Sequence, residues 1–412
     1  MNRKQLILIF LALAVLGGAS LLLLRRDTQS WSAQPGKMGR KLFPNFPIND
    51  VAAMNIQAGA DLRLARKDGI WRVRERGDYP ANFSQISELV QKLAALKISQ
   101  SEPIGPSQLA HMELLPPGKG MGSGTLVTFA DDKGKTIQSL LLGKKHLEEA
   151  RGSSQFAGAE FPNGRYVMLP ADPASLLLVS DPLDNLAADP VSWLDHDFFK
   201  IEKPASIAIV SADATNSWKL TRESETAPWV LADTNAGEIL DSNKVVSLSS
   251  AFSYASFVDV ATNTDAAKTG LDKPFGVNIS TFDHFAYAIK VGNKTPEDNY
   301  YLTVAVSAEF PTNRVPGKDE KPEDKAKLDK DFETQTKTLQ EKLASEKSLD
   351  KWIYLVNNSQ LEPLMRQRAE LMVEKKVDKP DANSTNSVPP LPQPVAPPPP
   401  DMPNLQPPAP PK

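Results

Sequence analysis

The sequence predicts an α+β fold in which a mostly antiparallel sheet with a covering helix occurs twice in tandem. Three observations lead to this prediction: an apolar amino-terminal stretch, a series of hairpin and helix patterns that appears twice in the same order, and a proline-rich carboxyl-terminal segment. We therefore divide the chain into an anchor (1–26), a linker (27–49), a first copy (50–190), a second copy (191–375) with a charged helical insertion (311–349), and a disordered tail (376–412).

The composition is that of a globular protein and narrows the functional classes. Of the 412 residues, 41% are hydrophobic and 24% are charged. A formal net charge of −3 gives no electrostatic reason for affinity to phosphates, so we expect no nucleic-acid partner. Because the chain has no cysteine, disulfides, thiolate catalysis and cysteine zinc sites are excluded.

The amino terminus predicts a membrane anchor. Leu6 to Leu24 are apolar except for a small-residue cluster, and a helix of that length spans roughly 28 Å, which matches a bilayer core. The apolar run continues past the small residues, which favours an uncleaved signal anchor over a cleaved signal peptide. Basic residues flank both ends and leave the orientation undecided by charge alone. Long domains translocate largely regardless of flanking charge, so this charge distribution is compatible with the single-pass protein of the cytoplasmic (inner) membrane with an extracytoplasmic bulk that we expect.

Each copy is expected to open with a β-hairpin and an amphipathic helix. Around 62–73 and 218–231, hydrophobic residues alternate on both sides of a turn, and each alternation includes a tryptophan, Trp71 or Trp229. Asn82 and Asp241 are then expected to cap helices whose apolar residues fall on one face. We interpret both tryptophans as core residues, and the alternative is a platform that stacks on a ligand.

The later part of each copy also matches. Leu114-Leu115-Pro116 in the first copy corresponds to Leu271-Asp272-Lys273-Pro274 in the second. Paired strands follow, ending in a glycine, Gly143 or Gly292, and a final apolar strand closes each copy. The same elements in the same order indicate a tandem duplication of one sheet-plus-helix unit.

The second copy alone contains a charged insertion. Between residues 318 and 347 its apolar residues have roughly helical spacing and form a narrow stripe. The first copy closes without such a segment, which indicates that the core does not need it. We consider a partner-docking helix, with a solvated excursion as the alternative. The candidate docking residues are Leu328, Phe332, Leu339 and Leu343.

The proline-rich tail cannot bury a core. Its asparagine, serine and proline residues, with the run Pro397 to Pro400, predict a disordered segment of polyproline II character. A spacer is the simpler interpretation, and a ligand for an aromatic groove is the alternative.

No catalytic, cofactor or metal site is expected. The four histidines lack the spacing of zinc ligands, and Asp195-His196-Asp197 is interpreted as a solvated connector rather than a catalytic centre. The glycine-rich stretch Gly118 to Gly124 precedes a predicted strand instead of a helix, so it reads as a flexible loop and not as a phosphate loop.

The pattern resembles a known family. The amino-terminal anchor, the hairpin ending in Gly69-Ile70-Trp71, the capped helix after it, the segment from Thr269 to Pro274 and the strand ending in Val291-Gly292 carry the resemblance. They resemble an uncharacterised membrane-anchored domain family (a domain of unknown function) encoded beside gliding-motility-type ABC transporter genes in bacteria. The similarity covers roughly residues 1 to 375, whereas the insertion and the tail depart from it. The resemblance implies an extracytoplasmic component that works with an ABC export system, and it supplies no catalytic residues.

The expected function is therefore non-enzymatic. We expect a membrane-tethered extracytoplasmic accessory or scaffold protein of an ABC-transporter-associated envelope complex, with ABC transporter subunits or other envelope proteins as partners. The alternative is an extracytoplasmic binding protein for a glycan or peptidoglycan fragment, held in a cleft between the two copies.

Overall fold

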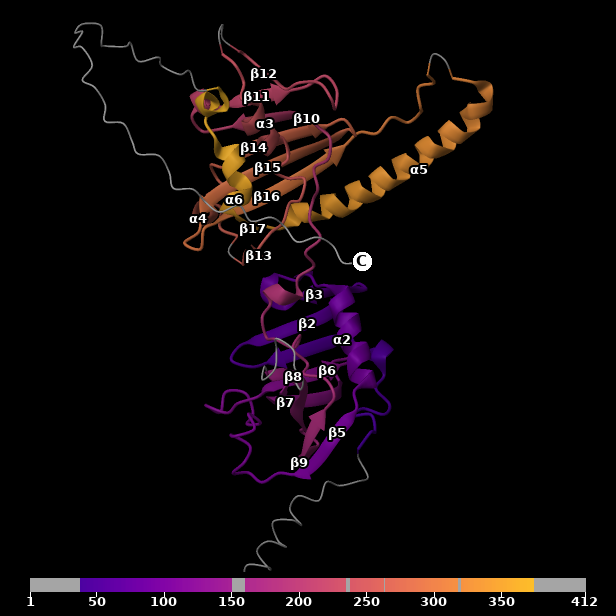
Figure 1. The fold of residues 1–412 in the computed structure, drawn as a ribbon, viewed down its shortest axis with the longest axis vertical. Helices are drawn as coiled ribbons and strands as arrows, with labels where there is room; N and C mark the ends of the chain where they lie inside the picture. Colours follow the sequence, from indigo (N-terminus) through magenta and orange to yellow (C-terminus); the bar gives the residue numbers. More distant parts are fainter. Residues whose placement is uncertain (1–37, 150–159, 235–237, 263, 318–319, 374–412) are drawn as a thin grey trace, which may run out of the picture. The chain divides into compact units, whose positions relative to one another are not determined.

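The computed structural model describes residues 38–149, 160–234, 238–262, 264–317 and 320–373, whose strands form two sheets (Figure 1). The anchor predicted at Leu6 to Leu24 and the proline-rich tail lie outside these residues. Among the described helices, none is both long enough and apolar enough to cross a membrane.

The first sheet has nine strands and one α-helix against it. Its elements are β1 (Ala53–Gln57), β2 (Asp61–Lys67), β3 (Ile70–Val73), β4 (Tyr79–Pro80), α2 (Phe83–Ala95), β5 (Ile98–Pro103), β6 (Thr125–Ala130), β7 (Thr136–Glu149), β8 (Glu160–Leu169) and β9 (Asp172–Val179). The strands lie in the order β4-β3-β2-β1-β6-β7-β8-β9-β5.

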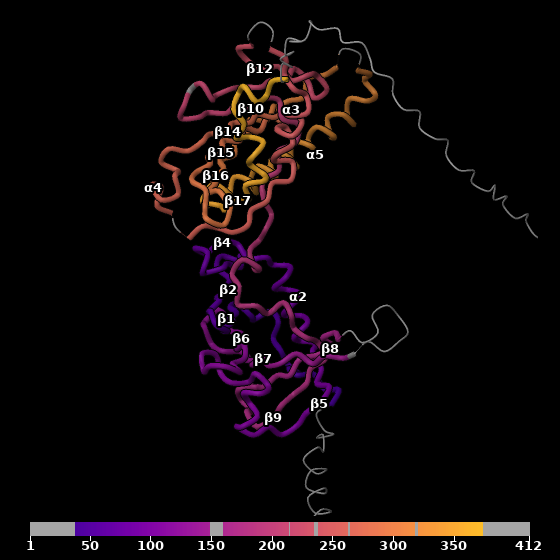
Figure 2. Tube along the Cα trace, turned by 60° about the vertical axis from the view of Figure 1, so that its left-hand side comes forward, coloured from indigo at the N-terminus to yellow at the C-terminus, as the bar shows by residue number. Residues whose placement is uncertain are grey.

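The second sheet has eight strands. Its elements are β10 (Pro204–Val210), β11 (Trp218–Thr221), β12 (Val230–Leu231), α3 (Ser242–Ser249), β13 (Asp259–Val260), α4 (Ala266–Thr269), β14 (Phe275–Thr281), β15 (Phe285–Lys294), β16 (Asn299–Ala308), α5 (Pro322–Lys347), β17 (Tyr354–Asn357) and α6 (Asn358–Leu361). The strands lie in the order β12-β11-β10-β14-β15-β16-β17-β13, and Figure 2 shows β14 to β17 in succession.

The two sheets have the same topology. When β10 is placed on β1, the strand order from β12 to β13 repeats the order from β3 to β5. Among the strands of the described residues, only β4 has no counterpart. The corresponding elements also follow one another in the same order along the chain, with α3 in the place of α2. Helix α5 is inserted before β17. The ladders within both sheets are antiparallel. The predicted α+β fold with a repeated, antiparallel sheet unit is confirmed.

Both predicted hairpins form. In the first, Asp68 and Gly69 have φ of 53° and 79°, as a two-residue type I′ turn requires, and Leu64 lies opposite Val73. In the second, Leu220 lies opposite Leu231. Strand register therefore makes Trp71 and Trp229 equivalent.

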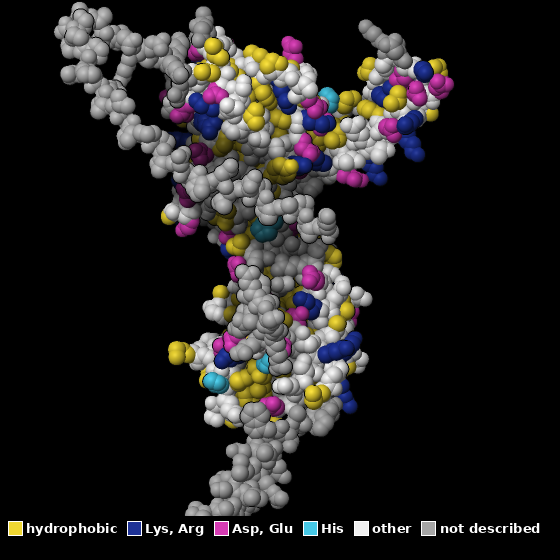
Figure 3. All heavy atoms as spheres, viewed as in Figure 1, with side chains coloured by type: hydrophobic (Ala, Val, Ile, Leu, Met, Phe, Trp, Pro, Cys, Tyr) yellow, Lys and Arg dark blue, Asp and Glu magenta, His cyan; other side chains and the backbone are white. Residues whose placement is uncertain are grey.

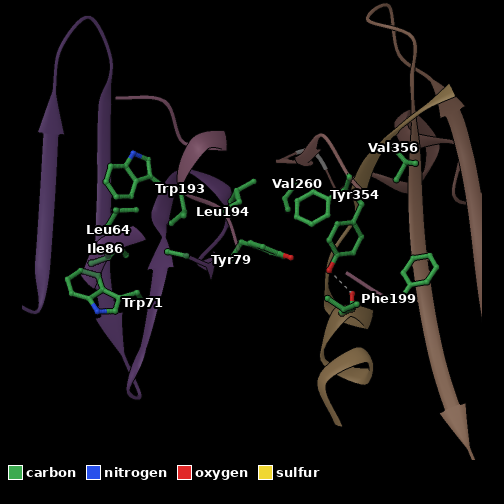
Figure 4. Packing of buried hydrophobic residues seen from close by; sticks show 14 of the residues in the cluster. Leu64, Trp71, Tyr79, Ile86, Trp193, Leu194, Phe199, Val260, Tyr354 and Val356 are labelled. Carbon is green, nitrogen blue, oxygen red and sulfur yellow. Dashed lines mark hydrogen bonds between the residues drawn. The ribbon is translucent and has the colours of Figure 1, made fainter. Parts of the chain in front are cut away.

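The predicted helix caps are present. The Asn82 side chain accepts a hydrogen bond from the backbone N–H of Gln85 at the start of α2, and the Asp241 side chain accepts from Asn243 and Lys244 at the start of α3. The apolar face of α2 is buried against the first sheet, and Figure 4 shows Ile86 beside Leu64 and Trp71.

Short 3₁₀ helices connect several elements: η1 (Ile48–Asp50), η2 (Arg74–Arg76), η3 (Val191–Trp193), η4 (Ala214–Asn216), η5 (Ser348–Lys351), η6 (Glu362–Met365) and η7 (Arg368–Leu371). The segment at η3 packs with the first copy: Trp193 is fully buried, and its carbonyl accepts a hydrogen bond from the Asn82 N–H. The second sheet begins only at Pro204.

Candidate functional site

Helix α5 carries the residues expected to dock a partner. It has 26 residues, so it is about 39 Å long. Pro322 occupies the first turn with Glu323 and Asp324, and Lys347 lies in the last turn, an arrangement that suits the helix dipole. Figure 1 shows the helix running outward from the second sheet, with its Pro322 end away from the strands.

A buried carboxylate fixes the carboxyl-terminal end of α5. Glu346 is 5% exposed, and its carboxylate accepts hydrogen bonds from the Lys200 backbone N–H at 3.0 Å and from the Tyr287 hydroxyl at 2.8 Å. Burial raises the pKa of Glu346 above its usual range, and these two hydrogen bonds act in the opposite direction. Because Tyr287 lies on β15, this contact joins the helix directly to the sheet.

Lys342 adds a second attachment one turn earlier. Its ammonium donates to the Lys200 carbonyl at 2.8 Å and to the Glu202 carboxylate at 3.2 Å. The same nitrogen lies 5.2 Å from the centre of the Phe285 ring. The short segment from Lys200 to Glu202 therefore holds α5 through the backbone of Lys200 and the side chain of Glu202.

An arginine connects the outer part of α5 to the segment that precedes it. Arg314 forms a bidentate pair with Glu320, and its Nε donates to Asp329 at 2.9 Å. The Arg314 and Glu320 side chains are only 16% and 9% exposed. The hydrogen bond from Arg314 lowers the pKa of Glu320. This interaction holds the segment leading into α5 against the helix.

The structure divides the predicted docking stripe. Leu339 and Leu343 are half-buried and pack on the core of the second copy. Phe332 lines a small cavity of about 160 Å³ with Phe282, His284 and Phe310. Leu328 is 38% exposed and is the member of the stripe that remains available to a partner.

The outer part of α5 is a solvated surface of mixed charge. From residue 321 to 331 every side chain is exposed except that of Asp329, which is half-buried. Figure 3 shows Lys and Asp or Glu side chains interspersed over this part of the helix. Such a surface suits specific ion pairing with a protein partner more than attraction to a uniformly charged polymer.

The histidine-containing connector does not form a catalytic arrangement. The Asp195 carboxylate accepts a hydrogen bond from the Asp197 backbone N–H, and the His196 ring stacks on Phe257 with centroids 5.0 Å apart. Burial raises the pKa of Asp195. The described residues contain no cluster of three or more His, Asp or Glu that could hold a metal ion.

The glycine-rich loop has the geometry of a turn. Gly118, Gly120 and Gly122 have positive φ, and the Leu115 backbone bonds to Gly122 and Gly124. The chain continues directly into β6, which agrees with the interpretation of this stretch as a loop.

The two equivalent tryptophans differ in exposure. Trp71 is 5% exposed and belongs to the core, as expected. Trp229 is half-buried, and the guanidinium of Arg222 lies 4.8 Å from its ring centre. Neither ring is open on both faces as a stacking platform.

Sequence reasoning missed the residues that attach α5, namely Glu346, Lys342 and Arg314. Of the three, only Glu346 could have been noticed in the sequence. It lies three residues after Leu343, so it falls on the same helix face as the apolar stripe although it is charged. Its hydrogen-bond partners, Lys200 and Tyr287, are far away in the sequence, so no local sequence pattern indicates the contact.

Comparison with known protein families gives a match that spans part of both copies. A family model described as a domain of unknown function (DUF4340) matches residues 71–274. The match begins in β3 and ends just before β14, so it includes parts of both copies. No curated protein and no solved structure matches the chain.

Proposed function

We propose that this chain is a membrane-tethered, extracytoplasmic accessory or scaffold protein of an ABC-transporter-associated envelope complex, and that it acts by binding a partner through α5. The partner is an ABC transporter subunit or another envelope protein. The anchor at Leu6 to Leu24 supplies the tether in this proposal, and no catalytic step is assigned.

The observation that supports this proposal is the contrast between the two ends of α5. The carboxyl-terminal end is fixed by a buried carboxylate, Glu346, and by the leucines that pack on the core. The outer end presents Leu328 among exposed charges of both signs. A rigidly held helix that exposes one apolar residue within a polar rim loses little conformational entropy when a partner binds.

The alternative is a binding protein for a glycan or peptidoglycan fragment. Such a site normally uses aromatic rings that are free to stack, and Trp71 is buried while Arg222 covers Trp229. These contacts favour the scaffold over the glycan-binding protein.

The test is affinity purification of the full-length chain from membranes. The variant carries Leu328→Ser with Lys325→Glu and Lys330→Glu, all at exposed positions on α5. The matched control carries Ile70→Ser with Lys133→Glu and Lys135→Glu, also exposed but outside α5. We expect the α5 variant to lose envelope partners that the control retains. Equal recovery of partners with both variants would refute a role for α5.

A further inference from the structure

The first copy contains a groove of about 350 Å³ that none of the preceding features uses. It lies between the first turns of α2, the β2–β3 hairpin and η1. Its floor is made of buried apolar side chains: Val51, Trp71, Ile86 and Val90.

Two large apolar side chains at this groove are exposed. Phe83, the first residue of α2, is 65% exposed, and Ile48 is 39% exposed. Neither is needed to close the core, because the buried face of α2 consists of residues other than Phe83, and η1, which contains Ile48, has no buried residue. Both side chains line the groove and contribute apolar surface to an otherwise largely polar opening.

A cation whose side chain has no hydrogen-bond or ion-pair partner among the described residues lies at the same groove. Arg66 is exposed and lies opposite Trp71 in the hairpin. Among the described residues, no hydrogen bond or ion pair engages its guanidinium, although its backbone N–H donates to the Ala52 carbonyl. Of the described residues that line the groove, Arg66 is the single charged one.

In the second copy, the arginine equivalent to Arg66 has partners within the protein. Arg222 is the register equivalent of Arg66, and its guanidinium lies over both Trp229 and Phe282, at 4.8 and 5.5 Å. Its Nε also donates to the Pro204 carbonyl at 2.7 Å. The guanidinium at this position is therefore engaged by aromatic rings and a carbonyl in the second copy, whereas in the first copy it has no such partner among the described residues.

Neutral hydrogen-bonding groups complete the lining. Gln91 donates one amide hydrogen to the Ser87 hydroxyl at 3.1 Å, which leaves its second amide hydrogen and its carbonyl oxygen for other partners. Asn49 lies on the η1 side of the groove. Such amides match the polar groups of an extended peptide backbone.

We propose that this groove binds a peptide segment of a partner protein in which a carboxylate side chain lies next to a large apolar one. Arg66 pairs with the carboxylate, since a guanidinium is geometrically suited to that group. Phe83 and Ile48 contact the apolar side chain, and Gln91 and Asn49 bond the peptide groups. The site is on the first copy and does not depend on the role of α5.

A protein segment fits this groove better than a phosphate polymer or a membrane surface. Those surfaces are bound by several cations acting together, whereas this groove has one. The other described residues of the lining are uncharged, either apolar or bearing an amide or hydroxyl group, which suits one carboxylate beside hydrophobic contact.

The test uses fluorescence anisotropy with the full 412-residue chain, purified in detergent. The probes are short fluorescein-labelled glycine–serine peptides, amidated at the carboxyl end, with a central Glu-Phe or Phe-Glu pair. We expect saturable binding of at least one probe, weakened about tenfold or more when Gln replaces the glutamate or Ala the phenylalanine. Arg66→Gln and Phe83→Ala should each weaken binding to a similar extent.

The matched control is Arg63→Gln, which removes the same charge from an exposed position on the opposite face of β2. It should leave the affinity unchanged, and thermal unfolding should show that all three variants are folded. Failure of every probe to bind would overturn the proposal, as would equal weakening by Arg63→Gln. Direct binding of the chain to phosphatidylglycerol vesicles that is lost in Arg66→Gln, with no peptide probe bound, would instead indicate a lipid surface.

Discussion

At the scale of residues, Gly143 and Gly292 lie where another segment of backbone packs closely against a strand. Gly143 follows Leu142, which lies opposite Thr125, and Gly292 follows Val291, which lies opposite Phe275. A Cβ atom on either glycine would clash with a backbone carbonyl in the segment that leads into the leucine-proline element (Leu114–Pro116 or Leu271–Pro274): that of Met112 in the first copy and that of Thr269 in the second. The glycines are therefore required because that segment lies directly against the strand.

Alanine substitutions at these glycines test the packing. Gly143→Ala and Gly292→Ala should each lower the free energy of unfolding by about 1–3 kcal/mol, because backbone must move to admit the new methyl group. Gly59→Ala is the control, since nothing lies within 4 Å of the added Cβ, and it should change stability by less than about 0.5 kcal/mol. Chemical denaturation of the purified chain measures all three. Equal effects at the three positions would contradict the packing.

The raised pKa of Glu346 predicts a pH dependence. Because the folded pKa lies above the ordinary value of 4.5, the folded state retains the proton to higher pH than the unfolded state does. The contribution of Glu346 to stability is therefore largest at acid pH and falls as the pH rises through the folded pKa. Unfolding midpoints should show that wild type loses stability relative to Glu346→Gln across this range.

Glu346→Ala measures what the hydrogen bonds of Glu346 contribute to stability, apart from the effect of its charge. It should destabilise the fold by about 1–3 kcal/mol, since the Lys200 N–H and the Tyr287 hydroxyl lose their acceptor. A pH-independent difference between wild type and Glu346→Gln would contradict the raised pKa.

At the scale of elements, α5 consists of two parts with different roles. The expectation that the core does not need the insertion is wrong for the inner end of α5, because Leu339, Leu343 and Glu346 pack on the second copy. For the outer part it stays a prediction. A stripe of helical spacing could be recognised in the sequence, but which of its residues face the sheet depends on contacts with β15 and with Lys200.

Two deletions test this division. Replacing residues 311–336 by a short glycine–serine bridge should change the free energy of unfolding by less than about 1 kcal/mol. Replacing 318–347 removes the buried contacts and should cost about 2–5 kcal/mol. Thermal and denaturant unfolding of the two variants give the comparison, and equal stability of both would show that the buried end of α5 contributes nothing.

At the scale of the whole molecule, local patterns were enough to predict the repetition but not the sheets. Alternation around Trp71 and Trp229, the caps Asn82 and Asp241 and the strand glycines all arise from short-range rules. Strand order does not: β1 lies between β2 and β6, and the edge strands β5 and β13 pair with β9 and β17 from much later in the chain. β13 has only two residues, too few to show any alternation.

The candidate site, too, could be predicted only where short-range patterns determine it. Leu328 and Phe332 could be identified from spacing alone, and the composition gave no reason to expect an enzyme. Arg66 could not be distinguished from Arg222 by sequence, because the two occupy equivalent positions and differ only in what the surrounding chain offers them.

Photocrosslinking in native membranes tests the central claim most directly. A benzophenone amino acid is placed at Leu328 in the full-length chain, and the control carries it at Ile70, which is 48% exposed on the first copy. After irradiation, the crosslinked products are identified by mass spectrometry. The account predicts that the Leu328 probe captures a subunit of an ABC transporter or another envelope protein that the Ile70 probe does not. Absence of any product specific to Leu328, with the chain folded and present in the membrane, would contradict it.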